Sequence, residues 1–259
     1  MNIGFIGAGN MATAMIGGLK SCGYSLYAYD INAEALKKLE EKGVRTVSDK
    51  ADLTEVCDVI VLAVKPNVYE SVLTDLQGKT KPLYISIAAG ITTRYVRSLL
   101  GDDARVVRVM PNTPAMVGAG MTAIAKTDRN TPEELAIAEE IFNQLGRTEQ
   151  LPESLMESVI SLTGSSPAYV FMMIEAMADA AVRAGIPRNL SYDLAAQAVY
   201  GSAKMVLESG THPAALKDAV CSPNGTTIEA VRVLEEKGFR SAIQEAMAAC
   251  DKRAFELKK

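Results

Sequence analysis

Short apolar runs alternate with amphipathic helical segments in the first half of the chain, and this alternation constrains the fold most. The runs lie at 3–6, 26–29, 59–64, 83–87 and 106–110, and helical segments at 33–41, 68–76 and 93–100 lie between them. The run at 59–64 (VIVLAV) contains no polar residue, so neither face of that strand suits contact with water. We therefore predict an α/β fold, a doubly wound parallel sheet covered by helices on both faces.

The second half has a different pattern. One more strand at 121–125 and one more helix at 131–145 are expected, with Thr131 as the cap of this helix and Gly146 at its end. From residue 155 onward strand patterns are absent. The remaining segments have helical spacing and lie at 168–184, 190–207, 227–236 and 239–257. Glycines fall where these helices need C-terminal caps, at 185, 210 and 238.

The turn after the first apolar run has the pattern G-x-G-x-x-A, and a helical segment follows at once. The residues are Gly7, Ala8, Gly9, Asn10, Met11 and Ala12. The first glycine allows a tight turn, the second lets the backbone approach a pyrophosphate, and the alanine permits close packing. The phosphates would lie on the amides of the helix that begins near Asn10. We expect a dinucleotide-binding, Rossmann-type domain at 1–150 and an all-helical domain at 151–259.

Asp30 ends the second strand, about twenty residues beyond the glycines. A carboxylate at this position accepts a hydrogen bond from a ribose 2′-hydroxyl and repels a 2′-phosphate. No arginine follows within several residues, which favours NADH over NADPH as the cofactor. Lys37 or Lys50 could still supply a cation.

Three more loops leave the carboxyl ends of predicted strands, where open α/β sheets bind ligands. The small residues at 88–90 would let a nicotinamide ring approach the backbone. The candidate cofactor-binding residues here are Ala63, Val64, Lys65, Pro66, Ala88, Ala89, Gly90 and Asn112. Each loop alone could be ordinary turn chemistry. Their common edge favours a binding role.

A Ser-Pro-Asn-Gly turn at 222–225 leads into the helical segment that begins at Thr226 and Thr227. Free amides at a helix start, with hydroxyls beside them, suit a small anion such as a carboxylate. A helix start capped by a threonine is the ordinary alternative.

Several segments closely resemble the pyrroline-5-carboxylate reductases. They are AALKDAVCSPNGTTIEAVRVLEEKGF at 214–239, GSSPAYVF at 164–171, AVKP at 63–66, RVMPNTP at 108–114 and GFIGAGNM at 4–11. The resemblance spans essentially the whole chain. It implies reduction of the cyclic imine of L-1-pyrroline-5-carboxylate to L-proline, the last step of proline synthesis, by NADH or NADPH. It also implies a homodimer joined through the helical domain, which can assemble into larger oligomers.

The resemblance also implies roles for residues of the second half. The substrate carboxylate would lie on the backbone amides around Ser222, Asn224, Gly225 and Thr226. The Thr227 hydroxyl would face the ring nitrogen as the catalytic group, and Glu153 would lie near the substrate. Most relatives have glycine in place of Asn224, and many have it in place of Ser166. Asparagine tolerates a positive φ best among the other residues, so we expect the turn to keep its shape.

The composition excludes several other chemistries. His212 is the only histidine, so a multi-histidine metal site is impossible, and we expect it on the surface where a helix starts. Four scattered cysteines fit reduced thiols in the cytoplasm. A net charge of −4 gives no basic field for nucleic acid. The longest apolar stretch, 168–184, contains charged residues, and no export segment is expected.

Two alternative functions are open from the residues alone. A hydroxyacid or phosphogluconate-type dehydrogenase would use a lysine on a helix, and only Lys204 and Lys217 lie in the middle helices. A dinucleotide-sensing regulator would bind the cofactor without turnover, with the helices as a dimerisation platform. The helices rich in Ala and Met suggest contact with a second subunit, although they could also form their own core. The segment 214–239 favours the imine reductase.

Overall fold

The computed structural model describes residues 1–259, which form two compact units. The first comprises Met1–Ser165 together with Cys250–Lys259, and the second comprises Ser166–Ala249. The boundary that we expected at residue 150 falls inside the first unit. The residues that follow it still belong to the sheet core, because Met156 and Val159 pack in one cluster with three side chains of the sheet.

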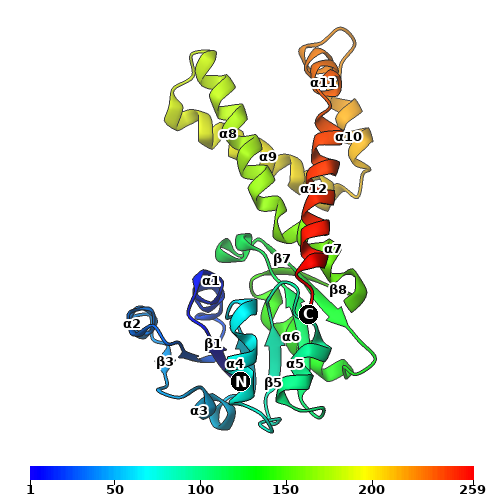
Figure 1. Ribbon diagram of the computed structural model, residues 1–259. Helices are drawn as coiled ribbons and strands as arrows, with labels where there is room; N and C mark the ends of the chain where they lie inside the picture. Colours follow the sequence, from blue (N-terminus) through cyan, green and yellow to red (C-terminus); the bar gives the residue numbers. More distant parts are fainter. The chain divides into compact units, whose positions relative to one another are not determined.

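An eight-stranded sheet forms the centre of the first unit (Figure 1), in the order β3-β2-β1-β4-β5-β6-β7-β8. The first six strands are parallel, β7 is antiparallel to β6, and β8 is parallel to β7. The bounds are β1 (Asn2–Ile6), β2 (Ser25–Tyr29), β3 (Arg45–Thr46), β4 (Val59–Leu62), β5 (Leu83–Ser86), β6 (Arg105–Met110), β7 (Gly120–Lys126) and β8 (Gly146–Pro152). Because β1, β4, β5 and β6 are parallel, their carboxyl ends lie together at one end of the sheet, which is the edge where the strands terminate.

Helices cover both faces of this sheet. Alternate residues of β1 point to opposite faces, so Phe5 packs with α1, α2 and α6 while Ile6 packs with α3, α4 and α5. This is the two-sided burial predicted from the continuous apolar runs. The helices are α1 (Asn10–Leu19), α2 (Ala33–Glu40), α3 (Lys50–Val56), α4 (Tyr69–Thr74), α5 (Thr93–Leu100) and α6 (Pro132–Asn143). Shorter helical turns connect the elements at η1 (Pro66–Val68), η2 (Thr113–Val117), η3 (Glu153–Leu155), α7 (Met156–Val159) and η4 (Ile160–Gly164).

The edge strands β3 and β8 differ from the prediction. Gly146 was expected to end a helix, but α6 ends before it and Gly146 begins β8. The residues of β8 are mostly polar and alternate in exposure, as befits an edge strand, so they carry no apolar run. The expected cap of α6 is confirmed: Thr131 and Glu134 form a reciprocal capping box.

The second unit is helical, as predicted. Its helices are α8 (Ser166–Arg183), α9 (Arg188–Ser209), α10 (Pro213–Val220), α11 (Thr226–Glu236) and most of α12 (Phe239–Glu256). Gly185, Gly210 and Gly238 all have positive φ after helices, the conformation expected of C-terminal caps. His212 lies on the surface at the start of α10, where its side chain accepts a hydrogen bond from the Ala214 amide.

Large apolar side chains of the second unit are exposed in a single copy. Phe171 and Met172 of α8 keep 61% and 69% of their surface accessible, and Leu194, Tyr200 and Leu207 of α9 are also exposed. So much apolar surface on neighbouring helices is typical of an interface. None of the helices combines the length and the apolar character that a membrane-spanning segment requires.

Candidate active site

The glycine-rich turn between β1 and α1 has the geometry of a phosphate cradle. Gly7 has a φ of 106°, and a Cβ atom on it would lie 2.7 Å from the Ala63 carbonyl oxygen, so only glycine fits. A Cβ atom on Gly9 would meet nothing within 4 Å, so the space above this residue is open. No side chain caps α1 and its first turn has no acidic residue, which leaves its amides free for an anion.

Asp30 is tied to this turn. One of its carboxylate oxygens accepts a hydrogen bond from the Ala8 amide at 2.6 Å, and the other accepts one from the Asn32 amide at 2.8 Å. The sequence suggested only a contact with a ribose. The structure adds that the carboxylate holds the glycine turn against the end of β2, and each oxygen retains capacity for a further donor.

Two cavities flank the turn. A small apolar cavity of about 180 Å³ is lined by Gly7, Asp30, Ile31 and Val64 among others, and its walls suit a flat ring. A larger cavity of about 620 Å³ lies against Asn10 and extends between α1 and α2.

Two lysines of the larger cavity were missed from the sequence. Lys38 and Lys42 both line it, four residues apart on or just after α2. We named Lys37 and Lys50 instead, but Lys50 is engaged by Asp75 at 2.7 Å. Helical spacing could have indicated Lys38, because it places this residue beside Ala35, three positions earlier, which lines the same cavity.

The other predicted cofactor residues lie in loops at the same edge of the sheet. The loop after β4 holds Ala63 to Pro66, the loop after β5 holds Ala88 to Gly90, and Asn112 follows β6. The apolar run at 59–64 is shorter as a strand than expected, since β4 ends at Leu62 and leaves Ala63 and Val64 in the loop.

Asn112 is buried, and its side chain is already bonded within the protein. It accepts a hydrogen bond from the Met121 amide at 2.9 Å and donates one to the Thr163 carbonyl at 3.0 Å. This residue therefore fixes the loop after β6 to β7 and η4, and its side-chain amide keeps one N–H donor and one acceptor lone pair for a further partner.

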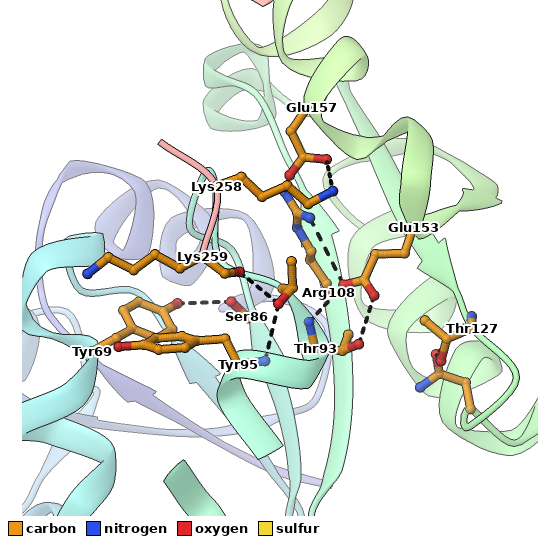
Figure 2. Close-up of polar contacts among 12 residues, drawn as sticks. Tyr69, Ser86, Thr93, Tyr95, Arg108, Thr127, Glu153, Glu157, Lys258 and Lys259 are labelled. Atoms are coloured by element: carbon orange, nitrogen blue, oxygen red, sulfur yellow. Dashed lines mark hydrogen bonds and ion pairs between the residues drawn. The ribbon is translucent and has the colours of Figure 1, made fainter. Parts of the chain in front are cut away.

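Glu153 lies at the start of α5 (Figure 2). Its carboxylate accepts hydrogen bonds from the Thr93 amide at 2.7 Å and the Thr93 hydroxyl at 2.9 Å. The buried Arg108 guanidinium lies 4.0 Å away and is also paired with the buried Glu157 at 3.0 Å. Glu153 thus belongs to an ionic network of the first unit, whereas the other predicted substrate residues belong to the second.

The turn at 222–225 brings those substrate residues together. Asn224 has a φ of 57° and is the one non-glycine residue with positive φ, so the expected turn shape is confirmed. Gly225 precedes α11, and its amide donates to the Ser222 carbonyl at 3.0 Å. No side chain caps α11, so the amides of its first turn, from Thr226 onward, face an exposed turn and are open to an anion.

Comparison with known proteins identifies the family. Residues 153–257 match a domain model described as pyrroline-5-carboxylate reductase dimerisation, and residues 2–90 match one described as NADP oxidoreductase coenzyme F420-dependent. A pyrroline-5-carboxylate reductase of Escherichia coli is 48% identical, over 99% of this chain and 98% of the relative. The chain belongs to the pyrroline-5-carboxylate reductase family.

Solved structures agree with this family assignment. The Coxiella burnetii pyrroline-5-carboxylate reductase has a TM-score of 0.91 at 37% identity and covers 100% of this chain and 98% of its own. A Plasmodium falciparum pyrroline carboxylate reductase, solved with NADP bound, has a TM-score of 0.91 at 29% identity with the same coverage. Membership in this reductase family confirms the predicted family and fold, and it removes the hydroxyacid-dehydrogenase alternative.

The lysines considered for that alternative are paired on the surface. Lys217 lies 2.6 Å from Asp218, and Lys204 lies 3.6 Å from Glu208. The match of 153–257 to a reductase dimerisation domain supports the homo-oligomer expected from the apolar helices.

Proposed function

We propose that this protein is a pyrroline-5-carboxylate reductase that reduces the C=N bond of L-1-pyrroline-5-carboxylate and forms L-proline. The observation that carries the proposal is the full-length match to reductases of this name, together with a glycine turn whose free amides and open space fit a dinucleotide. A bound nicotinamide dinucleotide supplies the hydride. The protein's own groups bind the dinucleotide and the imine, orient them towards each other and exclude water.

The first unit provides the cofactor site in this proposal. The amides of Asn10 and Met11 bind the pyrophosphate at the positive end of α1. The small apolar cavity beside Asp30 receives the adenine ring. The loops at 63–66 and 88–90 border the nicotinamide, and their small residues permit close approach.

The second unit provides the substrate groups. The amides at the start of α11 bind the carboxylate of the substrate, and the Thr227 hydroxyl orients the ring nitrogen. The substrate arrives as the protonated imine. Its C=N π electrons move to nitrogen as the hydride adds to carbon, so the amine needs no proton from an enzyme residue.

We further propose that two copies associate through the exposed apolar faces of α8 and α9. We also propose that the enzyme acts in the cytoplasm, where its four free cysteines suit a reducing medium.

We propose that NADH is the better cofactor. The Asp30 carboxylate, fixed by two backbone amides, lies where a 2′-phosphate would be repelled. Lys38 and Lys42 oppose this preference, because either ammonium group could neutralise such a phosphate in the larger cavity.

The test is to measure initial rates of cofactor oxidation with L-1-pyrroline-5-carboxylate, using NADH and NADPH at matched concentrations. We expect rapid turnover that depends on the imine, with the higher kcat/KM for NADH. The paired variants Lys38→Met and Lys42→Met should lower activity with NADPH more than with NADH. Tight dinucleotide binding without turnover would contradict the proposal and favour a dinucleotide sensor. A higher kcat/KM with NADPH would contradict only the proposed preference.

A further inference from the structure

Tyr69, the first residue of α4, is completely buried, and its hydroxyl contacts two strands. The hydroxyl donates a hydrogen bond to the Leu62 carbonyl at 2.9 Å. It also lies 3.0 Å from the Ser86 hydroxyl, a contact that Figure 2 shows. A tyrosine hydroxyl has a single proton, and the Leu62 carbonyl can only accept. Ser86 is therefore the donor to Tyr69.

The two partners of Tyr69 occupy matching positions in the sheet. Leu62 is the last residue of β4 and Ser86 the last residue of β5, and the two are paired across these parallel strands. The Tyr69 hydroxyl thus connects the last residue of β4 with the last residue of β5. The main chain then leaves β4 into the loop 63–66 and leaves β5 into the loop 88–90.

The Tyr69 hydroxyl stays protonated, so its hydrogen bond to Leu62 does not depend on pH. Burial raises the pKa of Tyr69 well above that of a free tyrosine, while the Ser86 hydroxyl and the Ala88 main chain act in the opposite direction. The phenol therefore stays neutral throughout the pH range of an enzyme assay and keeps the proton that it donates.

We propose that Tyr69 is a positioning residue for the dinucleotide. By joining the ends of β4 and β5, its hydroxyl sets the spacing of the two loops that border the nicotinamide. This inference rests on the proposed function, since the loops matter only if the dinucleotide binds between them. The bond lies at the last residue of each strand, directly before the loop 63–66 and one residue before the loop 88–90.

Tyr84 provides a matched control. It is also completely buried, and its hydroxyl donates to the Lys79 carbonyl at 2.6 Å, but Lys79 precedes β5 and lies towards the other edge of the sheet. Removing either hydroxyl takes one donor from a main-chain carbonyl: the Leu62 carbonyl keeps the Ile87 amide at 3.4 Å, and Lys79 is an exposed residue. Only removal of the Tyr69 hydroxyl also loosens the loops of the cofactor site.

The experiment compares Tyr69→Phe, Tyr84→Phe and Ser86→Ala with the unchanged full-length protein. The Kd for NADH and NADPH is measured by fluorescence titration, the KM for both substrates by steady-state kinetics, and the melting temperature by calorimetry. We expect Tyr69→Phe to raise the Kd and the KM for the dinucleotide by about tenfold, with the KM for the imine changed less than about twofold. Ser86→Ala should raise the dinucleotide Kd by about threefold, because the bond to Leu62 remains. Tyr69→Phe and Tyr84→Phe should both lower the melting temperature. Tyr84→Phe should leave the dinucleotide Kd unchanged.

The possible outcomes separate this inference from the proposed function. If the unchanged protein binds and oxidises the dinucleotide but Tyr69→Phe has the same Kd, the positioning role is wrong and the proposed function stands. The role is also wrong if Tyr69→Phe and Tyr84→Phe change the Kd equally, because the effect would then be general loss of stability. If the unchanged protein binds no dinucleotide, the proposed function fails, and this inference fails with it.

Discussion

Two glycines of the same turn are constrained in different ways. Gly7 is required by the fold, since its positive φ and its approach to the Ala63 carbonyl leave no room for a side chain. Gly9 has an ordinary φ of −72°, and a Cβ atom on it would meet no protein atom within 4 Å. On the proposed account, the requirement for glycine at position 9 comes from the ligand.

Substitution of these two glycines should therefore have different effects. We expect Gly9→Ala to weaken dinucleotide binding by about tenfold or more while the melting temperature changes by only about 2 °C. Gly7→Ala should lower the melting temperature by several degrees in addition to weakening binding. Calorimetry with a binding titration checks both variants. Unchanged affinity in Gly9→Ala would argue against phosphate binding at this turn.

Thr227 is the residue on which the proposed chemistry depends most. Thr227→Ala should reduce kcat/KM for the imine by about 10- to 100-fold, because one hydrogen bond to a charged group is lost. Thr227→Ser keeps the hydroxyl and should retain most of the activity. The dinucleotide Kd should stay unchanged in both, since Thr227 lies in the second unit. Equal kinetic constants for Thr227→Ala and the unchanged enzyme would exclude this role.

Cys57 gives a prediction about pH. Burial, and secondarily the nearby Asp58 carboxylate, raises the pKa of its thiol to about 12. The folded protein therefore holds this proton more tightly than the unfolded chain, so the contribution of Cys57 to stability is present below about pH 9 and is lost as the pH rises towards 12.

At pH 9 only about one Cys57 thiol in a thousand is ionised in the folded protein. Alkylation followed by peptide mass spectrometry should leave Cys57 unmodified in native buffer and should label it fully in concentrated urea. Rapid labelling in native buffer would show that the thiol is neither buried nor protonated.

At the scale of the elements, the sequence predicted the strands that contain an apolar run and missed the strands that do not. β4 was evident from its continuous run, and both its burial and its central place in the sheet are confirmed. β8 was missed because an edge strand needs backbone pairing rather than apolar residues, and β3 has only two residues. The glycine turn that we propose for the cofactor was predictable from glycine spacing. The contact of Asp30 with the Ala8 amide was not, since it depends on how two strand ends meet.

The turn before α11 can be tested at the same scale. Asn224 adopts a left-handed conformation that costs alanine about 1 kcal/mol more than glycine. Asn224→Ala should therefore lower the melting temperature by about 2–4 °C, whereas Asn224→Gly should be neutral or slightly stabilising. Thermal unfolding measures this difference. If asparagine also narrows the carboxylate pocket, Asn224→Gly should change the KM for the imine. Equal stability of the alanine and glycine variants would contradict the assigned turn conformation.

At the scale of the whole molecule, the residues that we propose for the cofactor belong to the first unit and those that we propose for the substrate carboxylate and ring nitrogen to the second. The second unit also carries the exposed apolar surface. A charged side chain on that surface changes the stability of a single copy little, because it stays in water. It strongly disfavours burial of the surface against a second copy. We expect Met172→Glu to shift the protein to monomers, measured by size-exclusion chromatography with light scattering. Its dinucleotide Kd should remain within about twofold, because the proposed cofactor site lies in the first unit.

Gln77→Glu provides the control, because it adds the same charge at an exposed position of the first unit. This variant should keep the oligomeric state of the unchanged protein. If Met172→Glu also keeps that state, the face of α8 that carries Met172 is not part of the interface.

The most direct test of the whole account is to follow the transferred hydrogen. L-1-pyrroline-5-carboxylate is incubated with the protein and with NADH or NADPH stereospecifically deuterated on each face of nicotinamide C4 in turn, and the product is analysed by NMR and mass spectrometry. The account predicts L-proline with one deuterium on ring carbon 5, for one face of the cofactor only, formed in a one-to-one ratio with oxidised cofactor. Cofactor oxidation without labelled proline, or no oxidation with either dinucleotide, would contradict imine reduction as the function of this protein.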